Sequence, residues 1–351
     1  MIRPVKSQLK TLGFICCAAM LSPAAYADLF DGVAAHQSGD YVTALRVFKP
    51  LAEQGVADAE YRLGVMYANG QGVPKDNLQA IGWYRKAAER GNTSAQTNLG
   101  VMYAMGQGVP KDEKQTVDLY RKAAEKGHPG AQNNLGAMYV DGRGVVSDDR
   151  QGVTWYLKSA DQGHAGAQSN LGAMYATGRG VTKDSQQAVA WFSKAAAQGN
   201  ASAQYHLGLA YATGHGTAKD EQQAVGWYRK AVEQGHSGAQ NNLGVMYASG
   251  QGVLADYSQA MALYRKAVEQ GYVGAMNNLA VMYADSLGVP KDEEEAYFWW
   301  LLASGHGDLT ARKNRDLIAT RLSPVQRDNA RARAVAWIPN ARTVRDNDSS
   351  R

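Results

Sequence analysis

The sequence predicts an all-α fold, a right-handed α/α solenoid of stacked helix hairpins. Three observations predict it: a strict internal repeat, apolar residues at helical spacing, and glycines and aspartates where helices should end and begin. The pair Leu63-Gly64 returns every 36 residues as far as Leu243-Gly244, and a seventh copy reads Leu279-Ala280. A period of this length is typical of stacked repeats in which each unit contacts only its neighbours.

The first copy, residues 57–92, shows why each repeat should form two helices. Ala59, Leu63 and Met66 recur at spacings of three and four, which predicts an amphipathic helix. Gly70 predicts its end, because glycine adopts the left-handed conformation at little cost. Asp76 predicts the N-cap of the second helix.

Two further columns follow the same step. The predicted caps of the second helices are Asp76, Asp112, Asp148, Asp184, Asp220, Asp256 and Asp292. A mainly aromatic column, which we expect to be buried, comprises Trp83, Leu119, Trp155, Trp191, Trp227, Leu263 and Trp299.

The unit resembles the Sel1-like repeat, a relative of the tetratricopeptide repeat with a longer, glycine-containing loop. The resemblance rests on Ala-Gln-x-Asn-Leu-Gly-x-Met-Tyr, then Gly-x-Gly-Val-x-x-Asp, then Ala-x-x-Trp-Tyr-x-Lys-Ala-Ala-x-x-Gly. It implies seven repeats at 57–92, 93–128, 129–164, 165–200, 201–236, 237–272 and 273–308. Residues 28–56 read as a shorter tetratricopeptide-like capping hairpin, 309–338 as C-terminal capping helices, and 339–351 as a disordered tail.

The N-terminus has the features of a secretory signal peptide. Residues 1–27 combine a basic start, a short apolar run and the small-x-small sequence Ala25-Tyr26-Ala27. The apolar run is too short to span a membrane, so we expect no transmembrane segment. Both cysteines lie in this segment, so the exported chain would have no disulfide and no thiol chemistry. The expected location is the periplasm, with the extracellular space as the alternative.

The distribution of charge argues against a nucleic-acid partner. Residues 28–308 carry 24 basic and 28 acidic side chains, whereas residues 309–351 carry ten basic and four acidic ones. A nucleic-acid-binding solenoid would gather its basic residues along the repeats rather than in a tail.

No residue pattern predicts catalysis, a cofactor or a metal site. The Gly-x-Gly loops follow helices and not strands, which favours helix ends over a phosphate cradle. His128, His164 and His236 share one repeat position with Asn92 and Asn200, which favours a surface residue at the start of a helix over a metal ligand.

The alternative function is that of an enzyme. The resemblance implies it, because cysteine-rich members of the Sel1-like repeat family have been linked to β-lactam binding or hydrolysis. A serine acylase would need a Ser-x-x-Lys turn, and the one instance, Ser7 to Lys10, lies in the predicted signal peptide. We therefore expect a non-catalytic protein.

A protein or peptide partner is expected on the concave face, which the first helix of each repeat lines. The column two residues before each leucine should point away from the core, and it varies between repeats. The column one residue before is mostly asparagine, whose amides either grip a peptide backbone or bond internally. The candidate binding residues are Tyr61, Arg62, Thr97, Asn98, Asn133, Asn134, Ser169, Asn170, Tyr205, His206, Asn241, Asn242, Asn277 and Asn278.

The resemblance also implies classes of partner. Exported members act as scaffolds in envelope assembly and signalling, as host-interaction factors, or as immunity proteins that neutralise phospholipase toxins of type VI secretion. The residues do not select among an envelope complex, a host protein and such an effector.

The first prediction concerns processing. The exported protein should begin at Asp28 and occur in the periplasm, because the apolar run carries a cleavage site and cannot span the bilayer. N-terminal sequencing or intact mass after export measures this. A product that retains Met1 in the membrane fraction would contradict the signal peptide.

Overall fold

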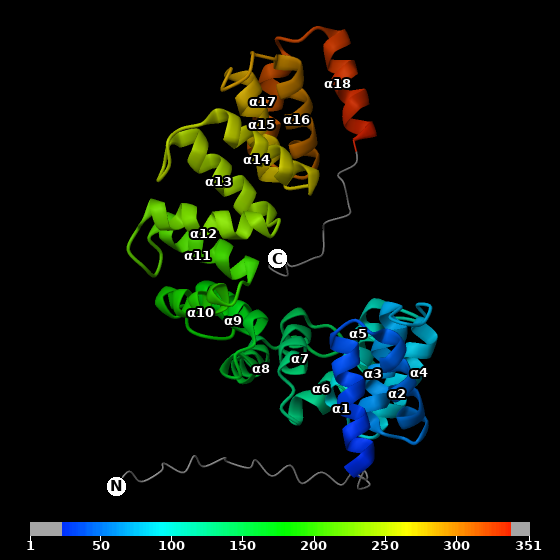
Figure 1. Cartoon of the computed structure of the whole chain (residues 1–351). Coiled ribbons are helices and arrows are strands. Elements are labelled where there is room, and N and C mark those ends of the chain that lie inside the picture. Colours follow the sequence, from blue (N-terminus) through cyan, green and yellow to red (C-terminus); the bar gives the residue numbers. More distant parts are fainter. Residues whose placement is uncertain (1–22, 338–351) are drawn as a thin grey trace, which may run out of the picture. The chain divides into compact units, whose positions relative to one another are not determined.

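The computed structural model describes residues 23–337, and in this part of the chain every regular element is a helix (Figure 1). These residues form two compact units: an N-terminal unit of residues 23–126 and a C-terminal unit of residues 127–337. The predicted tail at 339–351 and most of the predicted signal peptide lie outside the described residues. No helix among those described has the length and apolar character that a bilayer crossing requires.

The N-terminal unit is a row of three hairpins in which each helix packs against the next along the chain. Its helices are α1 (Pro23–Gln37), α2 (Tyr41–Glu53), α3 (Ala57–Asn69), α4 (Asn77–Glu89), α5 (Thr93–Met105) and α6 (Glu113–Glu125). The short turn before α2 contains Gly39 in the left-handed conformation, and Asp40 caps α2. Helix α1 begins before the expected cleavage point at Asp28.

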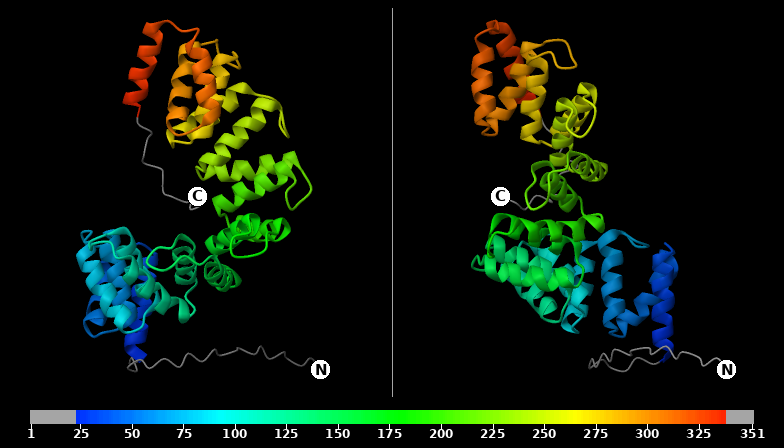
Figure 2. Two further views of the ribbon diagram at one scale, coloured as in Figure 1. Left: turned by 180° about the vertical axis from the view of Figure 1, so that it is seen from behind. Right: turned by 90° about the vertical axis from the view of Figure 1, so that its left-hand side faces the viewer.

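The C-terminal unit continues the pattern, and Figure 2 shows its hairpins stacked in chain order. Its first helices are α7 (Pro129–Asp141), α9 (Ala165–Thr177), α11 (Ala201–Thr213), α13 (Ser237–Ser249) and α15 (Val273–Ala284). Its second helices are α8 (Asp149–Asp161), α10 (Ser185–Ala197), α12 (Glu221–Glu233), α14 (Tyr257–Glu269) and α16 (Glu293–Gly305), followed by α17 (Leu309–Ala319) and α18 (Pro324–Ala336). The predicted all-α repeat fold is therefore confirmed.

The predicted helix caps are confirmed. All seven aspartates accept a hydrogen bond from a backbone N–H in the first turn of a second helix, as Asp76 does from Gln79 at 3.0 Å. Both glycines of the first loop, Gly70 and Gly72, have positive φ, so they serve the turn. In the seventh copy Ser286 takes the first glycine's place at φ 58°, and its hydroxyl donates to the Val289 carbonyl.

The glycine of each Leu-Gly pair marks the closest contact inside a hairpin. A Cβ on Gly64 would lie 2.6 Å from the Tyr84 ring, so only glycine lets α3 settle on that ring. The ring at this position is the buried aromatic of each second helix: Tyr84, Tyr120, Tyr156, Phe192, Tyr228, Tyr264 and Trp300. The prediction that the tryptophan column fills the core is therefore wrong by one position.

The tryptophan column lies at the edge of the core, except that Leu263 in the same column is buried. Trp83, Trp155, Trp191 and Trp227 are half-buried, and the lysine three residues later covers each ring. The ammonium nitrogens lie 3.9–4.3 Å from the ring centroids. The lysine stem and charge thereby shield an aromatic face that the neighbouring helices leave open.

A row of buried glutamines joins successive hairpins, which the sequence analysis did not foresee. Gln168 of α9 donates to the Ala160 carbonyl of α8 at 3.2 Å and accepts from Gln198 at the end of α10 at 2.8 Å. Gln204 repeats both bonds one unit later, with the Ala196 carbonyl and with Gln234. One side chain thus ties three helices together.

The first repeat replaces this amide pair by an ion pair. Glu60 is 1% exposed, and its Oε1 lies 3.3 Å from Nε of Arg90, which occupies the place of the second glutamine. The two substitutions occur together, so the contact between the two helices is kept while its chemistry changes.

The chain end covers the last hairpin much as predicted. Ser323 and Gln326 form a capping box at the start of α18, and α18 packs on α16. Ala330 is buried and Trp337 meets the Trp299 ring edge-on. Val335 takes no part in this cover and is 88% exposed, because it lies on the outer side of α18.

His128, His164 and His236 cap the first helices of their repeats, as expected for a repeat position that asparagine occupies in other copies. Nδ1 of His128 and His164 accepts from the Ala131 and Ala167 N–H groups at 3.1 Å, and His236 does the same with Ala239. These rings are half-buried rather than on the surface as expected. Burial lowers the pKa of His164, and burial together with nearby His164 lowers the pKa of His128.

The second prediction separates core from cap. Leu171→Ala should lower the free energy of unfolding by about 2–5 kcal/mol, because Leu171 is fully buried. His164→Ala should cost about 0.5–2 kcal/mol through the lost cap, and His164→Asn should restore it, as Asn92 and Asn200 cap the same position. Urea denaturation measures all three. A loss from His164→Ala equal to that from Leu171→Ala would refute the capping role.

The third prediction concerns pH. Burial lowers the pKa of His128 and His164, so the folded chain holds both rings neutral below their ordinary pKa of 6.5, and a neutral Nδ1 can accept the capping bond. The unfolded chain therefore binds protons first, and stability should fall as pH drops through about 6.5 toward the lower folded pKa. The double variant His128→Asn/His164→Asn should lose less of its urea midpoint between pH 7 and pH 5 than the parent. Equal losses would contradict the assignment.

Candidate partner-binding site

The first helices carry all fourteen predicted binding residues, but the two columns lie in different surroundings. Within each unit, a first helix packs against its own second helix and the second helix before it. A position opposite the leucine is therefore not automatically open to solvent.

The column two residues before each leucine lies largely between repeats. Thr97, Ser169 and Asn241 are buried, so the expectation that this column faces solvent is wrong for them. The Asn241 Oδ1 accepts from Asn278 of the next first helix at 2.9 Å, and the Tyr205 ring stacks on His236 at 4.6 Å. The other members, Tyr61, Asn133 and Asn277, are half-buried.

The column one residue before each leucine is half-exposed and faces the preceding hairpin. Asn98 donates to the Tyr84 hydroxyl at 3.3 Å, and Asn242 donates to the Tyr228 hydroxyl at the same distance. In the first repeat the Arg62 guanidinium lies over the Phe48 ring, 5.8 Å from its centroid. Burial and nearby Tyr61 raise the pKa of Tyr84 to about 12, so its hydroxyl keeps its proton.

The asparagines also bond to one another across repeats. Asn133 donates to Asn134 at 3.3 Å and accepts from Asn170 at 3.0 Å. Asn241 likewise donates to Asn242 at 3.1 Å. Of the two alternatives for the asparagine ladder, the structure shows the internal bonds. Each amide still has further hydrogen-bonding capacity on its exposed side.

The accessible stripe of the first helices contains three positions at helical spacing: one before, two after and six after the repeated leucine. The position six after is exposed throughout and differs widely: Asn69, Met105, Asp141, Thr177, Thr213, Ser249 and Asp285. The position two after includes Leu209 and Val245, which are 36% and 39% exposed. The variable, solvent-directed column exists, but sequence reasoning assigned it to the wrong residues.

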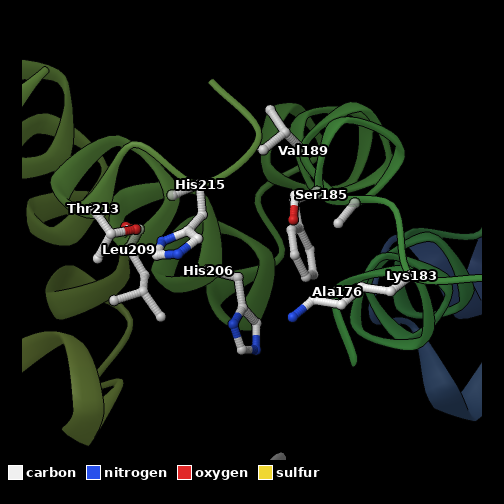
Figure 3. A pocket seen from close by; sticks show the side chains of 11 residues that line it. Ala176, Lys183, Ser185, Val189, His206, Leu209, Thr213 and His215 are labelled. Carbon is white, nitrogen blue, oxygen red and sulfur yellow. The ribbon is translucent and has the colours of Figure 1, made fainter. Parts of the chain in front are cut away.

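The ladder is interrupted in the fifth repeat by an aromatic cluster. His206 stacks on Phe192 with ring centroids 4.8 Å apart, and Tyr205 meets the His206 ring edge-on. Beside this cluster α9, α10 and α11 enclose a pocket of about 300 Å³ (Figure 3). Figure 3 places His206, Leu209 and Thr213 on one side of it and Ser185, Val189 and Lys183 on the other.

The chemistry of this site is that of a binding surface. Residues 23–337 contain no group of three or more histidine, cysteine, aspartate or glutamate side chains that could hold a metal ion. The stripe offers amides, hydroxyls and exposed aliphatic groups, which suit contact with another polypeptide.

The model of the family described as Sel1 repeat matches seven consecutive segments: residues 57–92, 93–128, 129–164, 165–200, 201–236, 237–272 and 273–308. No curated protein matches the chain significantly.

Solved structures add similar proteins. A protective antigen present in uropathogenic Escherichia coli strains, displaying an SLR fold, is 36% identical over 89% of this chain and 69% of its own, with a TM-score of 0.70. A Sel1 repeat protein from Oxalobacter formigenes is 31% identical over 68% of this chain and 96% of its own, with a TM-score of 0.64. An immunity protein from Pseudomonas aeruginosa is 28% identical over 61% and 81%, but its TM-score of 0.42 is too low to bear on a shared role.

Proposed function

The chain belongs to the Sel1 repeat family, and from this membership and the geometry of the first helices we propose that it is an exported, non-catalytic scaffold that binds a protein or peptide. Sel1 repeat solenoids are suited to protein–protein interaction and are generally scaffolds rather than catalysts. The binding surface in this proposal is the accessible stripe.

The observation that carries the proposal is that buried positions of the first helices keep the same residue from repeat to repeat, whereas an exposed position of the accessible stripe does not. The buried leucine returns in every repeat, and the buried glutamine in all but the first and last, whereas the position six after the leucine changes in character from Asp141 to Thr177. Packing accounts for the repeated residues but places no demand on an exposed one. A surface whose side chains vary over a fixed frame can match the uneven surface of one partner.

The proposal of export rests on the sequence of residues 1–27. Its support is the basic start, the short apolar run and the small-x-small motif. The similar Escherichia coli protein is by its name a protective antigen, which favours export for this chain as well.

The fourth prediction tests the stripe in cells. A photo-crosslinking amino acid in place of Thr213 or Ser249, both exposed on first helices, should capture the same partner from both positions. The control is the same amino acid at Gln222, which is exposed on the second helix α12. Mass spectrometry of the crosslinked products identifies the partner. Equal capture from Gln222, or no shared product from the two first-helix positions, would contradict the proposal.

A further inference from the structure

The pocket between α9, α10 and α11 is lined by residues that differ from those at the same positions of other repeats. Three of its lining residues depart from what nearly every other repeat has at the same position. Phe192 stands where five repeats have tyrosine, His206 where five have asparagine, and Ala210 where six have methionine. All three meet at one place.

Together these departures change the chemistry of the groove. In two other repeats the asparagine donates to the tyrosine hydroxyl, as Asn98 does to Tyr84 and Asn242 does to Tyr228. Phe192 has no hydroxyl, and the His206 ring stacks flat on it with an interplanar angle of 16°. Ala210 in place of methionine removes a side chain from the floor. The pocket wall therefore consists mainly of aromatic and aliphatic groups.

The equivalent groove in the N-terminal unit serves as an internal comparison. It has a similar volume, about 310 Å³, so size does not distinguish the two. Its lining includes Asn69, Asn77, Tyr84 and Asn98, which present amides and a hydroxyl. Both grooves therefore arise from the repeat itself. Of the two, only the groove of the fourth and fifth repeats has a mainly apolar lining.

The rim of the pocket carries basic groups. Lys183 is exposed and, in Figure 3, its side chain extends toward His206. His215 lies on the opposite side beside Leu209 and Thr213. None of the described residues that line the pocket is acidic. The nearby Asp184 carboxylate accepts from the Gln186 and Gln187 N–H groups at the start of α10.

We propose that this pocket binds an internal segment of the partner in which a large apolar side chain is followed by an acidic one. The apolar side chain fills the space over Phe192 and Ala210, and the carboxylate pairs with Lys183. An internal segment fits better than a chain terminus, because the rim offers the Lys183 ammonium on a flexible stem and not a nest of backbone N–H groups. The inference rests on the proposed function.

The fifth prediction uses capped peptides as probes. Acetyl-Gly-Phe-Glu-Gly-amide should shift the methyl NMR signals of Ala176, Val189 and Leu209 in the whole chain. The triple variant Phe192→Tyr/His206→Asn/Ala210→Met restores the residues of the other repeats, so it should fold normally and bind about tenfold more weakly. Lys183→Met should weaken binding about threefold, since an exposed ion pair contributes less than the apolar contact. Gln222→Ala is the matched control and should bind as the parent does.

Comparison peptides decide the chemistry. Replacing phenylalanine by serine, or glutamate by lysine, should weaken binding. Unchanged binding by the triple variant, or equal binding of the lysine peptide, would overturn the proposal. Tighter binding of acetyl-Gly-Phe with a free carboxylate would assign the pocket to a chain terminus instead, which also overturns it. The peptide experiment needs no partner protein. Failed crosslinking at Thr213 and Ser249 would therefore refute the proposed function but would leave the measured peptide binding to the pocket unchanged.

Discussion

The second to sixth repeats carry a buried glutamine in the first helix, and in the second, fourth and fifth repeats this side chain bonds to the hairpin before it. In α9 the Gln168 amide donates to a carbonyl of the preceding hairpin and accepts from Gln198 at the end of its own. A buried amide that loses such partners costs about 1–3 kcal/mol, so the hairpins can slide neither along nor across one another without penalty. Both bonds recur at Gln204, and Gln240 accepts from Gln270. They explain why the period of the sequence does not slip, and they hold the groove between hairpins at one place in each repeat.

The hairpin itself needs a second constraint, the close contact of the Leu-Gly pair with an aromatic ring. Gly208 rests on Tyr228, where a Cβ would come within 2.7 Å of the ring. With the ring and the glutamine both fixed, the most exposed side chains of a first helix, those six after the leucine, are free to vary. The position six after the leucine can therefore change without disturbing the stack, whereas the asparagine one before the leucine also holds the stack, because Asn98 and Asn242 donate to tyrosine hydroxyls of the preceding hairpin.

The helix hairpins and their caps can be predicted from the sequence, because each depends on residues that are close together in the chain. The period predicts the hairpins, and Asp76 and Gly70 predict caps that depend on a few neighbouring residues only. The exposed face was misjudged because exposure in a stack depends on several helices at once. Asn241 points away from its own core yet is buried against Asn278 of the next repeat. Likewise the sequence predicts Trp227 as the core residue, but the core residue is Tyr228, because only the fold shows which ring meets the glycine. The recurring Gln-Gln spacing of thirty residues, from Gln168 to Gln198, was the overlooked signal.

Positions at which one repeat differs from the others say more about binding than the residues that all repeats share. In six of seven copies methionine occupies the position of Ala210, so packing in this fold accepts the larger side chain. Alanine there, together with Phe192 and His206, gives up a hydrogen bond and apolar contact that Tyr228, Asn242 and Met246 retain one unit later. Stability alone does not account for these changes, since phenylalanine lacks the hydroxyl to which Asn242 donates on Tyr228, and alanine buries less apolar surface than methionine. Glu60 and Arg90 show the opposite case, in which two changes compensate each other and keep the contact. The departures in the fourth and fifth repeats replace polar groups by the stack of His206 on Phe192, so their groove has a more apolar lining than the equivalent groove of the first and second repeats, and this lining is the reason for proposing an apolar ligand side chain there.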